Sequence, residues 1–342
     1  MKKQLAALLI LALVGAPLFA QGLSTPMATV KLTKTQIIAE KAFRDDVAKV
    51  EAMRKKALTA DERKAFLDDL IDDILFDQMC ERDGIKTSDA EVNSAIAQSK
   101  AQVSSQLGKA VSDAEYESLL ASQGTSLADL RSYYRKQILL QRWISTAKAA
   151  EIKAIPPITS DEILRNYDLL KSKLVRPETA RVAFIYYPFQ NSTQAERDKG
   201  AKIIKDLSER LAKGESFDSL RLRAADGSYG ATRDYVYVPK VVEASSQYGK
   251  ELFDSVFSLK DGTVSAPFEN DKGWWLVRKA ETFPQKQLEL SDPYQLGQQL
   301  SVQDFIAQSL AQQRQNDFLA KTLQELKTKL RSQAEVKIIG KP

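Results

Sequence analysis

Histidine is missing from all 342 residues of the chain, and cysteine occurs once, at Cys80, so the supply of reactive side chains is narrow. Histidine-ligated zinc, Ser-His-Asp hydrolysis and Cys-His proteolysis all need residues that this sequence lacks. It also has no glycine-rich phosphate loop and no Gly-x-Ser-x-Gly turn. Most carboxylates fall on polar faces of predicted helices, where solvation explains them. We expect no metal, no cofactor and, for Cys80, a buried inert thiol.

Two adjacent tryptophans, Trp274 and Trp275, stand in the stretch 271–279, DKGWWLVRK, of a chain that has only three. The pair fits an aromatic grip on a ligand, a plain core, or the remains of a catalytic site. The stretch predicts a short strand, and successive residues of a strand face opposite sides of a sheet. Each tryptophan therefore needs an interpretation of its own.

The first 20 residues predict a secretory signal peptide. Lys2 and Lys3 precede the apolar run 5–14, and Ala20 ends an acceptable cleavage site. An uncleaved membrane anchor is the alternative. We expect an exported chain, periplasmic in a cell with two membranes, with no stable membrane insertion after cleavage. Removing the two lysines lowers the net charge from +5 to +3, which does not suggest nucleic acid binding.

Residues 30–150 predict one helix after another. Apolar residues repeat at helical spacing between Phe66 and Met79, and Thr59 with Glu62 forms a capping box before them. Pro156 and Pro157 interrupt this helical pattern.

Strand and helix patterns alternate in the order β-α-α-β-α-β-β from residue 177 to 284, which predicts an α+β sheet domain. The stretches 180–189, 234–239, 262–270 and 273–281 are the expected strands, and 246–259 is one expected helix. A long amphipathic helix over 302–330 and a strand over 334–339 follow. Because a lone amphipathic helix cannot bury its own stripe, we expect it to pack back on the N-terminal helices. The helical domain would then be discontinuous, with the sheet domain inserted.

The stretches 67–96 and 126–145 resemble the N-terminal helical segment of the SurA and PrsA chaperones. Residues 178–283 are similar to one degenerate parvulin (PpiC-type) peptidyl-prolyl isomerase domain, through KGESF at 213–217, FSLKDGTV at 257–264 and GWWLV at 273–277. After the predicted signal peptide at 1–20, the resemblance implies a helical SurA-like domain at 21–176, a parvulin-like domain at 177–284 and a return segment at 285–342.

Departures from the parvulin pattern bear on catalysis. Active members carry a histidine in the first strand, where this chain has Val182 or Ala183, and another in the last strand, where it has Trp275. The family's Asp/Cys position falls near Asp226, and Leu252 stands where the cleft usually holds Phe. With both histidines replaced by apolar groups, the resemblance implies that isomerase activity is absent or residual.

The leading hypothesis is an exported chaperone that binds unfolded polypeptides, with outer-membrane proteins as the clients that the resemblance implies. The alternatives are an active peptidyl-prolyl isomerase and an envelope assembly module with one stable partner. The sequence does not predict the oligomeric state. Candidate client contacts, each of which also fits a core role, are Tyr186, Tyr187, Tyr235, Tyr237 and Trp274.

Overall fold

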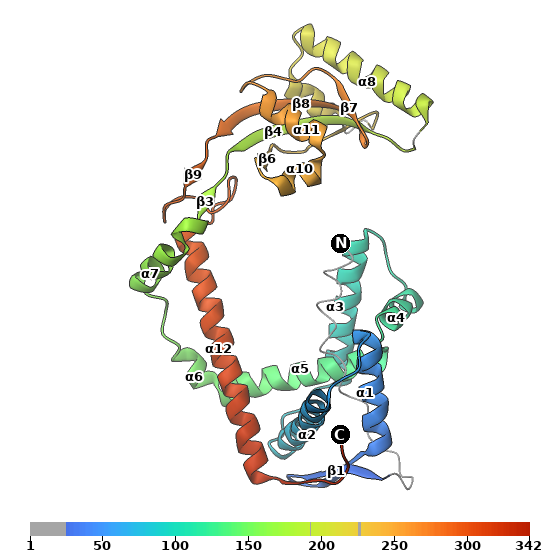
Figure 1. The fold of residues 1–342 in the computed structure, drawn as a ribbon, viewed down its shortest axis with the longest axis vertical. Coiled ribbons are helices and arrows are strands. Elements are labelled where there is room, and N and C mark those ends of the chain that lie inside the picture. The colour runs from blue at the N-terminus through green and yellow to red at the C-terminus, as the bar shows by residue number, and fades with distance from the viewer. Residues whose placement is uncertain (1–24, 192, 225–226) are drawn as a thin grey trace. The chain divides into compact units, whose positions relative to one another are not determined.

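The computed structural model describes residues 25–191, 193–224 and 227–342 (Figure 1). The predicted signal peptide lies outside the described residues. The chain divides into two compact units, one made of the residues up to Pro156 together with Gln315–Pro342, and the other of Pro157–Arg314. The first unit is therefore discontinuous and the second is inserted into it, which confirms the predicted α+β architecture.

The first unit begins with a hairpin that the helical interpretation of residues 30–150 missed. Strands β1 (Pro26–Lys31) and β2 (Thr35–Ala39) are antiparallel, and β10 (Glu335–Ile338) pairs with β1 on its other side. Gln78 secures the turn, because its Oε1 accepts the backbone N–H groups of Leu32 and Thr33, both at 2.9 Å. A local pattern does not show this hairpin, since the residue that fixes its turn lies on a helix far along the chain. The predicted strand at the C-terminus is confirmed.

Helices make up most of this unit, and local capping sets where several of them begin. Thr59 and Glu62 form the predicted capping box, and Ser88 with Glu91 forms another. Cys80 is buried, and burial raises the pKa of its thiol to about 12, so it is an inert core residue. The helices are α1 (Glu40–Arg54), α2 (Ala60–Arg82), α3 (Asp89–Leu107), α4 (Asp113–Ser122), α5 (Leu127–Ala147) and α6 (Ala149–Lys153).

The long helix α12 (Val302–Gln333) returns to the first unit through its C-terminal half. Leu326 and Leu330 join the buried core that α2 forms with Leu67 and neighbouring residues. Arg331 Nη1 lies 3.2 Å from an Asp68 carboxylate oxygen. Because both partners of that ion pair are partly exposed, the apolar contacts contribute more to this packing.

The second unit contains a five-stranded sheet in the order β5-β4-β8-β7, with β6 also paired to β4. Its centre is the long antiparallel pair β4 (Thr179–Pro188) and β8 (Gly273–Phe283). Short strands β3 (Val175–Arg176) and β9 (Lys286–Gln287) pair just outside it. The other strands are β5 (Gly230–Ala231), β6 (Val236–Pro239) and β7 (Phe268–Asn270). The helices are α7 (Ser160–Leu170), the 3-10 turn η1 (Lys171–Lys173), α8 (Gln194–Ala212), α9 (Phe217–Arg223), α10 (Val242–Tyr248) and α11 (Lys250–Ser258).

Two local predictions in this unit need correction. The expected helix over 246–259 is broken at Gly249, which has a φ of +89° and separates α10 from α11. The expected strand over 262–270 is reduced to β7, with Val264 making an isolated bridge to Arg278.

The second compact unit, Pro157–Arg314, extends on both sides beyond the range 177–284 expected for the parvulin-like domain. Ile163, Leu174, Leu288 and Ile306 form a separate buried cluster that joins α7 to the start of α12.

Candidate functional site

The pairing of β4 with β8 brings two Tyr–Trp pairs together, one on each face of the sheet. Tyr186 is opposite Trp275, and Tyr187 is opposite Trp274. Opposite residues in an antiparallel pair share a face, and successive residues alternate. The Trp275 side is hereafter the Trp275 face and the other side the Trp274 face. The expectation that the two tryptophans face opposite sides is therefore met by the strand register.

Val182 lies on the Trp275 face together with Leu252, and both are fully buried. Ala183 lies on the Trp274 face with Ile204 of α8. Of the two residues that could replace the first-strand histidine, only Val182 therefore shares a face with Trp275. Asp226, the match to the Asp/Cys position, lies outside the described residues.

Aromatic packing fixes Trp275. Its ring stacks on Tyr186 with centroids 5.1 Å apart, and it meets Phe184 edge-on at 6.1 Å. The indole N–H donates to Asn270 Oδ1 at 2.8 Å. Asn270 is itself buried and accepts the backbone N–H of Gly273 at 3.1 Å with the same oxygen. Trp275 is therefore held on two sides and by its polar atom.

Tyr186 is confined from its other side by Gly230. A Cβ on Gly230 would lie 2.5 Å from the Tyr186 ring, so only glycine permits this approach. The ring centroid of Tyr248, at the end of α10, lies 6.1 Å from that of Phe184. Burial raises the pKa of the Tyr248 hydroxyl. The Trp275 face is thus lined mainly by aromatic and aliphatic side chains, with Asn270 as a polar group at its edge and the buried Lys279 opposite Val182.

The Trp274 face is covered by α8. A Cβ on Gly200 would lie 2.8 Å from the Tyr187 ring and 2.9 Å from Trp274. The Tyr187 hydroxyl donates to Glu196 at 2.9 Å, and the residue is only 7% exposed. Trp274 Nε1 is buried without a hydrogen-bond partner in the described part of the chain. Both residues were candidate client contacts, and this packing leaves Tyr187 little surface to offer.

Tyr235 is enclosed by charged groups. Arg181 and Arg221 lie over its ring, with guanidinium carbons 5.0 and 5.6 Å from the ring centroid. Its hydroxyl is 3.3 Å from the Asp218 carboxylate, and burial raises the pKa of this hydroxyl. This geometry connects the residue just before β6 to Asp218 and Arg221 of α9.

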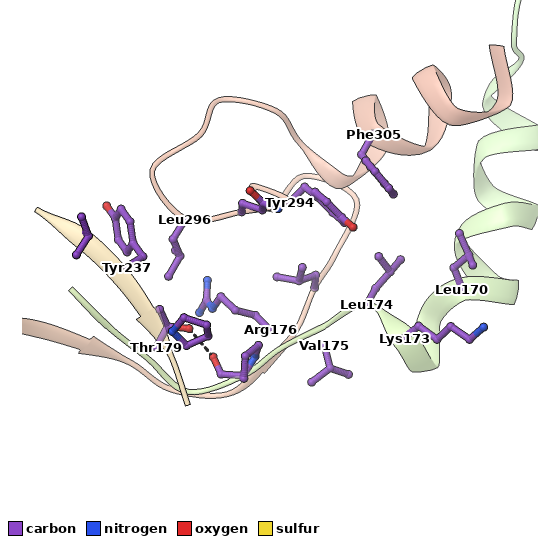
Figure 2. A pocket seen from close by; sticks show the side chains of 15 residues that line it. Leu170, Lys173, Leu174, Val175, Arg176, Thr179, Tyr237, Tyr294, Leu296 and Phe305 are labelled. Carbon is purple, nitrogen blue, oxygen red and sulfur yellow. Dashed lines mark hydrogen bonds between the residues drawn. The ribbon is translucent and has the colours of Figure 1, made fainter. Parts of the chain in front are cut away.

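Tyr237 lines a pocket of about 700 Å³ in the second unit (Figure 2). Gly297 packs against its ring, where a Cβ would lie at 2.5 Å, and Phe283 contacts it at 5.9 Å between centroids. The pocket is formed by η1, β3, β6, the segment after β9 and the first turns of α12. Among the five candidate client contacts, only Tyr237 lines this pocket.

A smaller pocket of about 320 Å³ lies in the first unit between α2, α5 and the C-terminal half of α12. Phe76, Leu140 and Leu323 provide apolar surface there, and Asp73 and Lys136 are paired at its edge. Burial raises the pKa of Asp73, and the nearby Lys136 opposes that shift. The sequence stripe on α2 predicted the helix but not this pocket, because three distant segments form it.

Within residues 25–191, 193–224 and 227–342, no group of three or more Asp, Glu, Cys or His side chains is placed so that it could hold a metal ion. The described helices also include none with the length and apolar character to cross a bilayer. Among the described residues, the side chains on the Trp275 face are mostly apolar; the exceptions include Lys279, which lies opposite Val182 and whose ammonium group donates to the Leu259 carbonyl at 3.0 Å.

Comparison with known proteins connects this geometry to a family. A SurA-like N-terminal domain matches residues 1–144, and a PPIC-type PPIase domain matches residues 158–292. The chain therefore matches, one after the other, the two kinds of domain that the resemblance to SurA and PrsA implied, in the order expected from its sequence.

Individual relatives are distant. The foldase protein PrsA of Clostridium acetobutylicum is 25% identical over 268 residues, which cover 77% of this chain and 71% of that one. The chaperone SurA of Legionella pneumophila is 25% identical over 253 residues, 73% of this chain and 53% of its own. This chain therefore spans about half the length of that relative. A SurA-like chaperone structure from Campylobacter jejuni covers 91% of this chain and 99% of its own at 16% identity, but a TM-score of 0.38 gives that likeness no weight.

Proposed function

We propose that this SurA/PrsA-type protein is an exported chaperone that holds unfolded polypeptides and that its PPIC-type domain no longer catalyses prolyl isomerisation. The observation that supports the loss of catalysis is the fixed position of Trp275. Stacked on Tyr186 and bonded to Asn270, it occupies the Trp275 face with a bulky side chain that has little freedom to move. The family resemblance expects a histidine at this position.

Prolyl isomerisation requires a site that binds the twisted amide better than the planar one, against a barrier of roughly 18–20 kcal/mol. Val182 and Trp275 stand at the two positions where the resemblance expects histidines, and neither side chain offers a polar contact to a twisted carbonyl. Val182 is apolar, and the indole N–H of Trp275 already donates to Asn270. A proline ring would also compete with the indole for space. The Trp275 face would therefore pack against apolar groups without binding the twisted amide better than the planar one.

Client polypeptides would be held by apolar surface with little sequence preference, as suits transient holding. We assign this role to the pocket between α2, α5 and α12, whose apolar side chains lie beside charged groups of both signs. The predicted signal peptide supports export to the periplasm, and unfolded outer-membrane proteins are the proposed clients there.

Aggregation of a urea-diluted outer-membrane protein, followed by light scattering, tests the holding function. We expect the full chain to suppress scattering at a few-fold molar excess. Leu323→Glu should weaken suppression several-fold, because it places a charge on the apolar wall of the pocket. Gln324→Glu adds the same charge at the neighbouring exposed position of α12 and should leave suppression unchanged. No suppression by the wild-type chain at stoichiometric excess would refute the proposal.

An active isomerase is the second candidate, favoured by the match of the PPIC-type domain over residues 158–292. It requires the proline ring to bind despite Trp275. Catalysis and holding are independent, so each has an assay of its own.

A further inference from the structure

The pocket lined by Tyr237 has a chemical character that client holding by apolar surface does not explain (Figure 2). Its volume of about 700 Å³ is within the usual range for pockets that bind ligands. Most lining side chains are apolar or aromatic, among them Leu174, Leu296 and Phe305. The two charged lining residues, Lys173 and Arg176, are both cations. An apolar pocket whose charges have one sign favours an amphipathic anion.

Arg176 is the central charge. Figure 2 shows its side chain among those of Leu296, Tyr294 and Thr179. Its Nε is buried and has no hydrogen-bond partner in the part of the chain that the structure describes. One terminal nitrogen lies 3.5 Å from the Pro284 carbonyl, the outer limit of a hydrogen bond. A buried guanidinium N–H without an acceptor is costly, and a carboxylate would satisfy it in a two-point pairing.

Asp292 is an acidic residue whose pKa Arg176 affects, but its carboxylate has other hydrogen-bond partners. Its carboxylate accepts from Lys286 Nζ at 2.6 Å and from the backbone N–H of Glu289 at 2.8 Å. These two bonds hold the pKa of Asp292 below its usual value, and Arg176 adds a weaker long-range effect. No carboxylate lines the pocket itself. The guanidinium therefore has capacity for an anion from outside the chain.

We propose that this pocket binds the C-terminal residue of a client polypeptide, with its free carboxylate on Arg176 and an apolar side chain against the pocket wall. This inference rests on the proposed client-holding function and adds a specific class of ligand to it. The carboxylate of a chain end sits on the carbon that also bears the side chain, so both groups reach a cation and an apolar wall together. Tyr294, fixed by stacking on Phe305 at 3.8 Å, and Gln295 supply polar groups beside the peptide backbone.

Fluorescence anisotropy with the full chain tests the proposal. The probe is a fluorescein-labelled hexapeptide that ends in Val-Phe with a free carboxylate, and its partner is the same peptide as the C-terminal amide. We expect the carboxylate to bind about tenfold more tightly, the usual scale of a charge-assisted pair. In Arg176→Gln this preference should fall to about one, while Arg176→Lys should keep part of it.

Arg165→Gln is the matched control, because Arg165 is an exposed cation of the same unit on α7 and does not line the pocket. It should keep the full preference for the carboxylate. The urea midpoint of Arg176→Gln should fall only slightly below that of the wild type, since Nε has no partner to lose and the substitution removes just the long bond to the Pro284 carbonyl and the contact over the Phe283 ring.

Equal binding of acid and amide by the wild type, or an unchanged preference in Arg176→Gln, would overturn the inference. Displacement of the peptide by decanoate at a tenfold lower concentration than by unlabelled peptide would also overturn it, since that result assigns the pocket to alkyl acids. Suppressed aggregation together with equal binding of acid and amide removes only the chain-end inference. Failure of suppression removes the proposed function.

Discussion

Each face of the β4–β8 pair carries one tyrosine and one tryptophan, but a different polar group of the two is hydrogen-bonded on each face. On the Trp275 face the tryptophan N–H donates to Asn270 at 2.8 Å, and no hydrogen bond of the Tyr186 hydroxyl is found among the described residues. On the Trp274 face the tyrosine hydroxyl is bound, by Glu196 at 2.9 Å, and the Trp274 N–H has no partner among the described residues. Neighbouring residues of one strand thus belong to different environments.

The covers of the two faces differ as well. On the Trp274 face, α8 approaches closely because Gly200 has no side chain. On the Trp275 face, Leu252 and Val256 of α11 complete a cluster around aromatic rings. The first arrangement is core packing under a helix. The second is a cluster of aromatic and aliphatic side chains in which Trp275 has partners for both its ring and its N–H.

Gly200→Ala should give the largest effect. Alanine raises helix propensity, but its Cβ would meet both Tyr187 and Trp274 below 3 Å, so we expect a loss of about 2 kcal/mol in unfolding free energy. Urea denaturation measures it. Lys202→Ala, at an exposed position of the same helix, should be nearly neutral. A neutral Gly200→Ala would contradict the close packing of α8.

The second largest effect should be a difference in stability between the phenylalanine variants of the two tryptophans. Trp275→Phe loses a hydrogen bond, whereas Trp274→Phe removes an N–H that has no partner. We therefore expect Trp275→Phe to be the more destabilising by about 1 kcal/mol in urea denaturation. Equal losses, or a larger loss for Trp274→Phe, would show that the two indoles are held alike.

The tyrosine pair should show the reverse order with a smaller amplitude. Tyr187→Phe gives up the bond to Glu196 and should cost about 0.5–1 kcal/mol, while Tyr186→Phe should stay near zero. Thermal unfolding of the two variants in parallel measures the difference. If Tyr186→Phe is the costlier of the two, the contrast between the faces fails.

Much of this fold follows from local sequence patterns. The capping box at Thr59, the strand alternation that separates Trp274 from Trp275, and the stripe on α12 are all short-range signals, and the structure bears them out. Strand β10 was also predicted from its composition. These elements are set by residues within a few positions of one another.

Other features depend on residues that the sequence holds far apart. The β1–β2 hairpin needs Gln78 of α2 to bind its turn, and the register that places Val182 with Trp275 is fixed only by pairing. The pocket around Arg176 joins segments from η1 to α12. The bond between Asn270 and Trp275 forms only once the turn between β7 and β8 is folded. No periodicity reveals such contacts.

We propose that Trp275 takes the place of a catalytic histidine and leaves the PPIC-type domain without isomerase activity. Magnetisation-exchange NMR on an Ala-Pro peptide, with the full chain at equimolar concentration, measures any catalysis that remains. We expect a cis–trans exchange rate equal to that of the peptide alone. A protein-dependent acceleration of exchange would overturn the proposal.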